Sequence, residues 1–224
     1  DYHGKIYMEE TWKMSTSPNG NGGWFSSMER CKVLELIKKE GIEWLNVFAV
    51  DNVLQRIADP VFIGATIAQH CTVGAKVVRK AAPDERVGVI CLEDGKPSIV
   101  EYYELTPELM AATDENGEPA YNFGVILNYL FYVEELIKIK ENHLPLHRVE
   151  RKIPYLDENG HLVKPAKPNG YKYETLVLDM IHLADSCLPF EVVRNKEFAP
   201  IKNKTGIDSV ESAQALLKEN QIEL

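Results

Sequence analysis

The fold class is decided by the stretch WLNVFAVDN, residues 44–52. Its apolar part, residues 44–50, ends in a continuous apolar run that is typical of a strand buried on both faces, as in a parallel sheet flanked by helices. Asp51 and Asn52 follow this run directly. Because the ligands of such sheets lie beyond the carboxyl ends of the strands, Asp51 is the first residue to consider for chemistry.

Helices are expected on both sides of this strand. Apolar residues recur near helical spacing over residues 24–40, which predicts one helix. Asp59 followed by Pro60 is an N-cap with proline at the first helical position, and it predicts a second helix that Gly74 closes. A further strand is expected at residues 75–79.

Two hairpins are expected to add antiparallel pairing. Each has a central dipeptide that tolerates the positive φ of a tight turn. Residues 152–170, which contain the second hairpin and a loop rich in proline, are interpreted as an arm or insertion. The strand pairs are residues 87–92 and 98–103 around Asp94-Gly95, and residues 152–155 and 161–164 around Asn159-Gly160.

The last third of the chain continues the alternation of helices and strands. A helix is expected at residues 173–184, a strand at residues 190–194, and a final helix opened by the capping-box pattern Asp208-x-x-Glu211. Helices that alternate with buried strands, together with hairpins, indicate an α/β fold of three layers with a mixed, mainly parallel sheet. Residues 1–224 are taken as one part of a catalytic domain.

The charge balance excludes some classes of partner. Lys and Arg number 25 against 34 Asp and Glu, so the net charge is −9 and no basic field attracts a phosphate backbone. We therefore expect no nucleic acid partner. The longest weakly polar stretch, residues 121–133, is shorter than the roughly 20 apolar residues that a membrane span needs, so no membrane association is expected.

The four cysteines are scattered and form no CxxC pair, which favours reduced, buried thiols and a cytoplasmic location. The chain opens without an initiator methionine and without the layout of a signal peptide. We expect that a segment precedes residue 1 in the natural protein. The oligomeric state stays open.

The segment SPNGNGG, residues 17–23, places three glycines directly before a predicted helix. Backbone N–H groups in such a segment can approach a ligand closely, and a helix N-terminus favours an anion. An ordinary surface turn has the same composition, and the segment fits neither GxGxxG nor a Walker loop. Both interpretations stay open on these residues alone.

Three charged residues are candidates for phosphate chemistry. Asp51, at the end of a buried strand, suits a hard cation such as Mg²⁺ that bridges phosphate oxygens, or it caps the following turn through its side chain. Lys172 and Lys202 could neutralise phosphate, although most lysines are simply solvated. No Ser/His/Asp or Cys/His set suggests a hydrolase, and Pro145 breaks the helical spacing of His143 and His147.

Taken in order, ten short motifs resemble those of the eukaryotic-type UDP-N-acetylhexosamine pyrophosphorylases and the related UTP-dependent sugar-1-phosphate uridylyltransferases. The resemblance spans nearly the whole chain, and it is specific because the set is ordered. The motifs are PNGNGG (18–23), VDN (50–52), ADP (58–60), FIG (62–64), GAKVV (74–78), VGV (87–89), VEY (100–102), KIPY (152–155), KPNG (167–170) and EFxPxKN (197–203).

The resemblance implies a GT-A-like fold of nucleotide-diphospho-sugar transferases. It implies that a hexose-1-phosphate oxygen attacks the α-phosphorus of UTP, which gives a UDP-sugar and pyrophosphate with Mg²⁺ as cofactor. The implied metal residue is Asp51. Carried over by position, the implied roles are the uridine and sugar for Gly20 and Asn21, sugar hydroxyls for Gly88 and Glu101, further substrate contacts for Asn122, Gly124 and Val125, and phosphate for Lys172 and Lys202.

The sequence departs from the family pattern in two places. The N-terminal loop Leu-x-Gly-Gly-x-Gly-Thr-Arg-Leu-Gly, which wraps the triphosphate, does not occur in these residues, so this chain alone is expected to be an inactive, N-terminally truncated part. Family members that take N-acetylated sugars carry Asn at the position of Val125. Glucose- or galactose-1-phosphate is therefore an alternative to N-acetylglucosamine-1-phosphate.

Two other functions stay open. A non-catalytic relative that binds nucleotide sugars is expected if the family loop is naturally absent. A purely structural or interaction module, in which the glycine segment and the lysines are surface features, is expected not to bind UDP-sugars at all.

Overall fold

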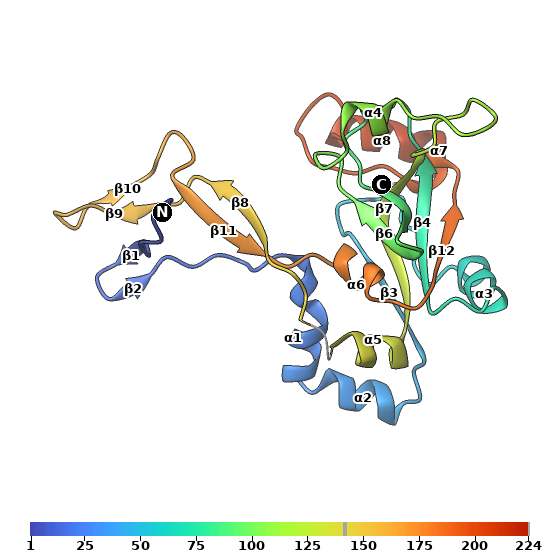
Figure 1. The fold of residues 1–224 in the computed structure, drawn as a ribbon, viewed down its shortest axis with the longest axis horizontal. Helices are drawn as coiled ribbons and strands as arrows, with labels where there is room; N and C mark the ends of the chain where they lie inside the picture. Colours follow the sequence, from blue (N-terminus) through green and yellow to red (C-terminus); the bar gives the residue numbers. More distant parts are fainter. Residues whose placement is uncertain (141–142, 224) are drawn as a thin grey trace. The chain divides into compact units, whose positions relative to one another are not determined.

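A computed structural model describes residues 1–140 and 143–223, apart from the side chain of Lys140. The chain forms two compact units (Figure 1). The smaller unit consists of Asp1–Leu34 and His143–Met180, and the larger unit consists of Glu35–Asn142 and Ile181–Leu224. No helix in the described ranges is both long and apolar enough to cross a membrane.

The larger unit is built on one six-stranded sheet in the order β12-β4-β7-β5-β6 (Figure 1), and β3 also pairs with β7. β4, buried along six of its seven residues, and β7 form its centre. The strands are β3 (Trp44–Phe48), β4 (Val73–Arg79), β5 (Val89–Glu93), β6 (Lys96–Val100), β7 (Phe123–Tyr132) and β12 (Cys187–Glu191).

The α/β fold with a mixed central sheet is confirmed, but the expectation of mainly parallel pairing is wrong. Among the described strands, only β12 and β4 pair in parallel, whereas β7 is antiparallel to β3, β4 and β5. The stretch 121–133, for which the sequence analysis predicted no strand, contains β7, which lies between strands that share one direction. The strands β3, β4 and β5 therefore pair with β7 and not with one another, and each of these pairs is antiparallel.

The pairing of β4 with β7 contains an irregularity. Ala75 pairs with Tyr129 and Val77 pairs with Val125, so β7 carries extra residues opposite one residue of β4. Leu127 within this bulge has a φ of 49°, and its carbonyl accepts the N–H of Ala49 at 2.9 Å. The bulge therefore ties the end of β3 to the middle of β7.

The expected helix 24–40 is divided into α1 (Trp24–Arg30) and α2 (Val33–Lys39). The division falls at Lys32, which has a φ of 60° and cannot continue a right-handed helix. Helix α3 (Pro60–Ala68) begins as predicted, because the Asp59 carboxylate accepts the Val61 N–H at 3.0 Å.

Gly74 does not close α3 but lies in β4. A Cβ at Gly74 would lie 2.6 Å from Thr66 Oγ1 and 2.7 Å from Phe62 Cε2. The absence of a side chain therefore lets α3 pack closely against β4. The remaining helices are α4 (Pro107–Met110), α5 (Val133–Lys140), α6 (Leu178–His182), α7 (Arg194–Glu197) and α8 (Val210–Glu219).

Three expectations in the last third of the chain are corrected. The expected helix 173–184 begins late, because residues up to Glu174 belong to strand β11 and only α6 is helical. The N-cap of α8 is Ser209, which exchanges hydrogen bonds with Ser212, so the capping box is shifted by one residue from Asp208. The expected strand 190–194 is β12, displaced toward the N-terminus.

Both predicted hairpins are confirmed. Glu93 pairs with Lys96 across a two-residue turn in which Asp94 and Gly95 have φ of 50° and 80°, as the dipeptide requires. The second hairpin lies in the smaller unit, with shorter strands than expected. The pairs of the smaller unit are β1 (Met8–Glu10) with β2 (Lys13–Met14), β8 (His147–Arg151) with β11 (Gly170–Glu174), and β9 (Tyr155–Leu156) with β10 (Leu162–Val163).

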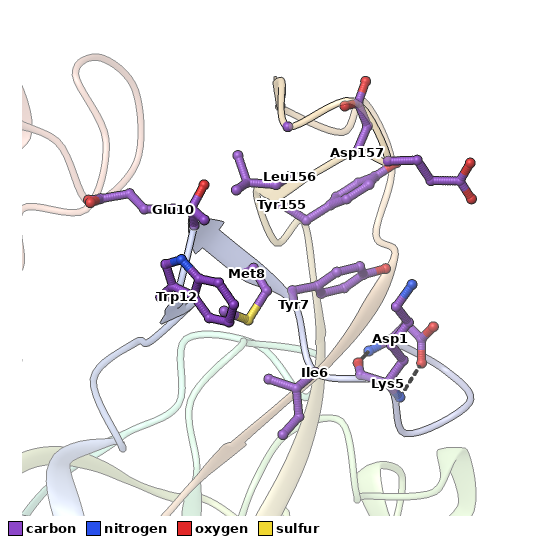
Figure 2. A pocket seen from close by; sticks show the side chains of 13 residues that line it. Asp1, Lys5, Ile6, Tyr7, Met8, Glu10, Trp12, Tyr155, Leu156 and Asp157 are labelled. Atoms are coloured by element: carbon purple, nitrogen blue, oxygen red, sulfur yellow. Dashed lines mark hydrogen bonds between the residues drawn. The ribbon is translucent and has the colours of Figure 1, made fainter.

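Figure 2 shows a cavity of about 750 Å³ in the smaller unit. The rings of Tyr7 and Tyr155 stack beside it with centroids 4.9 Å apart, and Trp12, 94% exposed, lies at its side. None of the ten residues that the sequence assigns to the site lines this cavity. This cavity is thus separate from the residues expected to carry chemistry.

Candidate functional site

The residues expected at the site fall in both units, and each group has its own geometry. The smaller unit carries Gly20, Asn21 and Lys172, and the larger unit carries Asp51, Gly88, Glu101, Asn122, Gly124, Val125 and Lys202.

The glycine segment packs against the chain that follows β11. The Gly22 N–H donates to the Thr175 carbonyl at 2.9 Å, and the Thr175 N–H donates to the Asn19 carbonyl at 2.8 Å. A Cβ at Gly20, where φ is 88°, would lie 2.2 Å from the Thr175 oxygen. Of the two interpretations left open by the sequence, these contacts favour the structural one for Gly20 and Gly22, because both glycines are required by a close approach within the protein and the Gly22 N–H donates to Thr175.

Asn21 is held in one orientation by this packing. Its Oδ1 accepts the Val177 N–H at 2.9 Å, while its Nδ2 has no partner among the described residues. An amide fixed through its oxygen offers its two N–H donors to a ligand, which is the chemistry needed to contact a base or sugar oxygen.

Lys172 lies on β11 with only 18% of its side chain exposed, and its Nζ is 2.6 Å from Glu174 Oε1. It lines a cavity of about 280 Å³ together with Arg151 and Lys152. Three basic side chains around a small cavity favour an anion. The lysine itself already has a carboxylate partner.

The larger unit brings Gly88, Glu101 and Val125 together. The Val125 N–H donates to the Gly88 carbonyl at 2.8 Å. A Cβ on Gly88 would lie 3.5 Å from Val125 Cγ2 and 3.6 Å from Glu101 Cδ. Ile99 Cγ2 is nearer still, at 3.2 Å, so the space above Gly88 is bordered by two apolar side chains and one carboxylate.

Gly124 and Asn122 have clear roles in the structure of β7. A Cβ at Gly124 would lie 2.7 Å from Val87 Cγ2, so the glycine permits close packing. Asn122 accepts the Lys80 N–H through its carbonyl at 2.9 Å and through Oδ1 at 3.2 Å. Contacts of either residue with a ligand stay a prediction.

Asp51 and Lys202 are also brought together, because the Ile201 N–H donates to the Asp51 carbonyl at 2.9 Å. The Asp51 carboxylate has no partner within the described residues. Lys202 Nζ lies 3.9 Å from Asp208 Oδ2, with half of the lysine side chain exposed. The side chain that caps the following turn is that of Asn52, not that of Asp51, because Asn52 Oδ1 accepts the Leu54 N–H at 3.3 Å.

Asn52 is a residue that sequence reasoning missed. It is 3% exposed, its Nδ2 donates to the Glu197 carbonyl at 2.7 Å, and its Oδ1 accepts the Ala199 N–H at 2.8 Å. One amide thus joins the segment that carries Asp51 to the segment that carries Lys202. The only sequence signal was its place next to Asp51.

A buried ion cluster lies behind these segments and was also missed. Lys76 on β4 is fully buried, with its Nζ 3.0 Å from Asp59 Oδ2 and 2.5 Å from Glu197 Oε2. Arg56 lies 3.9 Å from Asp59 and 3.7 Å from Glu197. Burial favours the neutral form of Asp59, but hydrogen bonds from Lys76 and Val61 and the charges of Lys76 and Arg56 outweigh it, so the pKa of Asp59 lies below its usual value. A lysine inside an apolar strand was the available signal.

A chain of amides, of which Asn128 is buried and Asn46 and Gln55 are half-buried, fixes the loop between β3 and α3. Asn46 Oδ1 accepts the Ala58 N–H at 2.9 Å, and its Nδ2 donates to Asn128 Oδ1 at 2.8 Å. Asn128, which is fully buried in β7, donates to Gln55 Oε1 at 2.7 Å. Satisfied polar networks of this kind specify one arrangement of a buried region.

The described residues contain no group of three or more His, Cys, Asp or Glu arranged to hold a metal ion. A single unpaired carboxylate such as Asp51 is nevertheless a usual protein contribution to Mg²⁺, which keeps several waters and takes other oxygens from substrate phosphates. The donor set therefore fits a cation that arrives with a nucleotide.

The sequence profile of the UTP–glucose-1-phosphate uridylyltransferase family matches residues 4–224, so the chain belongs to this family. A mouse relative named UDP-N-acetylhexosamine pyrophosphorylase-like protein 1 is 42% identical over 210 residues, which are 92% of this chain and 41% of that protein. The UDP-N-acetylglucosamine pyrophosphorylase of Saccharomyces cerevisiae is 37% identical, over 92% of this chain and 45% of the yeast protein.

A solved structure has a similar fold. The UDP-N-acetylglucosamine pyrophosphorylase of Trypanosoma brucei, crystallised with an inhibitor, aligns with a TM-score of 0.82 and 28% identity over 96% of this chain and 44% of that chain. These likenesses confirm the expected family. The chain spans less than half the length of the curated relatives described above.

Replacement of Gly20 tests the packing of the glycine segment. We expect Gly20→Ala to lower the free energy of unfolding of the smaller unit by about 2–4 kcal/mol, because the new methyl group meets the Thr175 carbonyl and the backbone has a positive φ. Urea unfolding followed by tryptophan fluorescence measures this. The control is Gly64→Ala in α3, which has open space around it and is expected to be neutral or stabilising; equal stabilities of the two variants would contradict the packing.

Proposed function

We propose that the intact protein containing this chain transfers a uridylyl group from UTP to a hexose-1-phosphate and releases pyrophosphate. The observation that carries the proposal is the pairing of the Asp51 and Lys202 segments through Asn52, at the carboxyl end of the central sheet. The names of the relatives support it. Activity is assigned to the longer protein, because the family's triphosphate loop is not among these residues.

The reaction needs no protein nucleophile. An oxygen of the hexose-1-phosphate forms a bond to the α-phosphorus of UTP, and the bond from that phosphorus to the oxygen that bridges to the β-phosphate breaks. Catalysis of such a transfer consists mainly of in-line positioning and of cations that offset charge on the phosphate oxygens. The ammonium groups of Lys172 and Lys202 are proposed for this role.

Mg²⁺ is the proposed cofactor, and Asp51 would hold it. When bound, the ion supplies positive charge to the phosphate oxygens and to the leaving pyrophosphate. The carboxylate of Asp51, which has no partner in residues 1–140 and 143–223, supports this assignment.

The space above Gly88 is proposed to take the hexose. Glu101 accepts hydrogen bonds from sugar hydroxyls there, while Asn21, whose Nδ2 has no partner in the part of the chain that the structure describes, serves the uridine and sugar. The apolar side chain of Val125 offers no hydrogen bond to an acetamido group, which favours glucose- or galactose-1-phosphate. The names of the relatives favour N-acetylglucosamine-1-phosphate, so both substrates enter the test.

A cytoplasmic location is proposed from the thiols. All four cysteines are free. Contrary to the expectation of buried thiols, Cys31 is exposed and the other three are half-buried. Partial burial still raises the pKa of Cys187 to about 12 and raises the pKa of Cys91 above its usual value. Reduced cysteines of this kind are typical of proteins in a reducing compartment.

Incubation of the intact protein with UTP, Mg²⁺ and a panel of hexose-1-phosphates tests the proposal. Pyrophosphate release with N-acetylglucosamine-, glucose- or galactose-1-phosphate is the expected result. No release with any of them would refute the activity. In that case, binding of UDP-sugars in calorimetry would identify a non-catalytic nucleotide-sugar-binding protein instead.

Lys202→Ala in the intact protein is expected to lower kcat by about 10²–10³-fold, because a charge that offsets the transition state is lost. Its effect on the free energy of unfolding is expected to stay within about 0.5 kcal/mol, since the side chain is half exposed. Steady-state kinetics and urea unfolding measure both. Lys204→Ala, an exposed neighbour, is the control; if Lys202→Ala matches its rate, Lys202 does not belong to the site.

Val125→Asn is expected to raise the ratio of kcat/KM for N-acetylglucosamine-1-phosphate to that for glucose-1-phosphate by about tenfold or more. The introduced amide can bond to the acetamido group, and one such bond contributes about 1–3 kcal/mol to discrimination. Val125→Ala removes the apolar side chain without adding an amide and serves as the control. The same ratio in both variants would show that Val125 does not face the sugar.

A further inference from the structure

Two segments of the larger unit carry Asp51 and Lys202. The aspartate loop, residues 49–59, runs from the end of β3 to the N-cap of α3, and the lysine segment, residues 197–202, follows from the last residue of α7. Neither segment is held by a regular β-ladder. Their mutual position depends on side chains and on isolated backbone hydrogen bonds.

Asn52 uses both ends of its amide to join the two segments. It donates to the Glu197 carbonyl and accepts the Ala199 N–H, at 2.7 and 2.8 Å. The backbone follows this bridge, because the Val53 N–H donates to the Ala199 carbonyl and the Ile201 N–H donates to the Asp51 carbonyl. Lys202 directly follows Ile201, whose N–H makes the last of these hydrogen bonds.

Lys76 joins the same two segments by charge. Its buried ammonium contacts Asp59, the last residue of the aspartate loop, and Glu197, the first residue of the lysine segment. The ammonium group of Lys76 is not in contact with solvent. The free-energy cost of its desolvation is therefore offset only when both carboxylates are in place. A displacement of either segment therefore leaves a buried charge uncompensated.

Stability alone does not require these residue types. An apolar side chain of similar volume at Lys76 would suit a strand that is buried at its neighbours, and buried ion pairs are often no more stabilising than such replacements. Unlike apolar contacts, the ion pairs and amide hydrogen bonds form only at a defined distance and angle, so they fix the relative position of the two segments. The precision of a site depends on such supporting contacts.

We propose that Asn52 and Lys76 are positioning residues that set the placement of the Asp51 carboxylate relative to the Lys202 ammonium. The proposal rests on the proposed function for its catalytic consequence. Neither residue touches substrate; both act through the two segments that they join. Loss of either one lets the lysine segment move and lowers the rate of transfer more than it lowers binding.

The test uses Asn52→Ala in the intact protein. We expect kcat to fall about 10–100-fold, KM for UTP to change less than about threefold, and amide exchange in residues 197–202 to accelerate. In a Lys202→Ala background the additional loss from Asn52→Ala is expected to disappear, because the residue acts through Lys202. Lys76→Met is expected to show the same dependence on Lys202.

The matched control is Ser186→Ala. Ser186 also joins two segments of the larger unit, accepting the Thr72 N–H at 3.0 Å, but it does so at the amino ends of β4 and β12. Its loss is expected to lower stability without changing kcat or the exchange of residues 197–202. If Asn52→Ala prevents folding, Asn52→Asp keeps the acceptor for Ala199 and removes the donor to Glu197, and a smaller fall in kcat is expected.

Three results would overturn the proposal. They are unchanged exchange in residues 197–202 for Asn52→Ala, equal effects of Asn52→Ala and Ser186→Ala on kcat, and full additivity with Lys202→Ala. A wild-type protein that releases no pyrophosphate would refute the proposed function instead. The exchange measurement still decides in that case whether Asn52 holds the lysine segment.

Discussion

The relative placement of the N-cap of α3 and the end of α7 depends on one desolvated ammonium group, that of Lys76. A cation without water must be surrounded by its counter-charges, so the N-cap of α3 and the end of α7 must both reach β4 at the same point. Asp59 meets two demands at once, because one oxygen caps the helix and the other faces the ammonium. Helix, strand and loop positions in this region are consequences of that charge balance.

Features set by neighbouring residues could be predicted from the sequence. The turn at Asp94-Gly95 and the helix start at Asp59-Pro60 follow from backbone preferences that act over a few residues. β7 and β11 could not be predicted in this way. A strand is stabilised by its partners, and the partners of β7 are distant in the chain, which is why its pairing reversed the expected character of the sheet.

In the candidate site, too, residues identified by their local sequence were predicted, whereas residues that act through distant contacts were not. Asp51 was predicted from its place at a strand end, and the structure puts it beside Lys202; Gly88, Glu101 and Val125 also lie close together, and their contacts with a sugar stay a prediction. The glycines at positions 20 and 22 were singled out for a different reason from the one the structure provides. Asn52 and Lys76 were missed, because their importance lies in contacts more than 100 residues away along the chain.

The ion pair of Lys172 with Glu174 has a consequence for ligand choice. The carboxylate is tethered two residues from the lysine, so it competes with any incoming anion at a high and constant local concentration. A lone phosphate ion therefore competes poorly with the Glu174 carboxylate for Lys172. Under the proposed function, a nucleotide that presents several charged oxygens and is anchored elsewhere by its base and sugar competes with Glu174 better than a lone phosphate ion does.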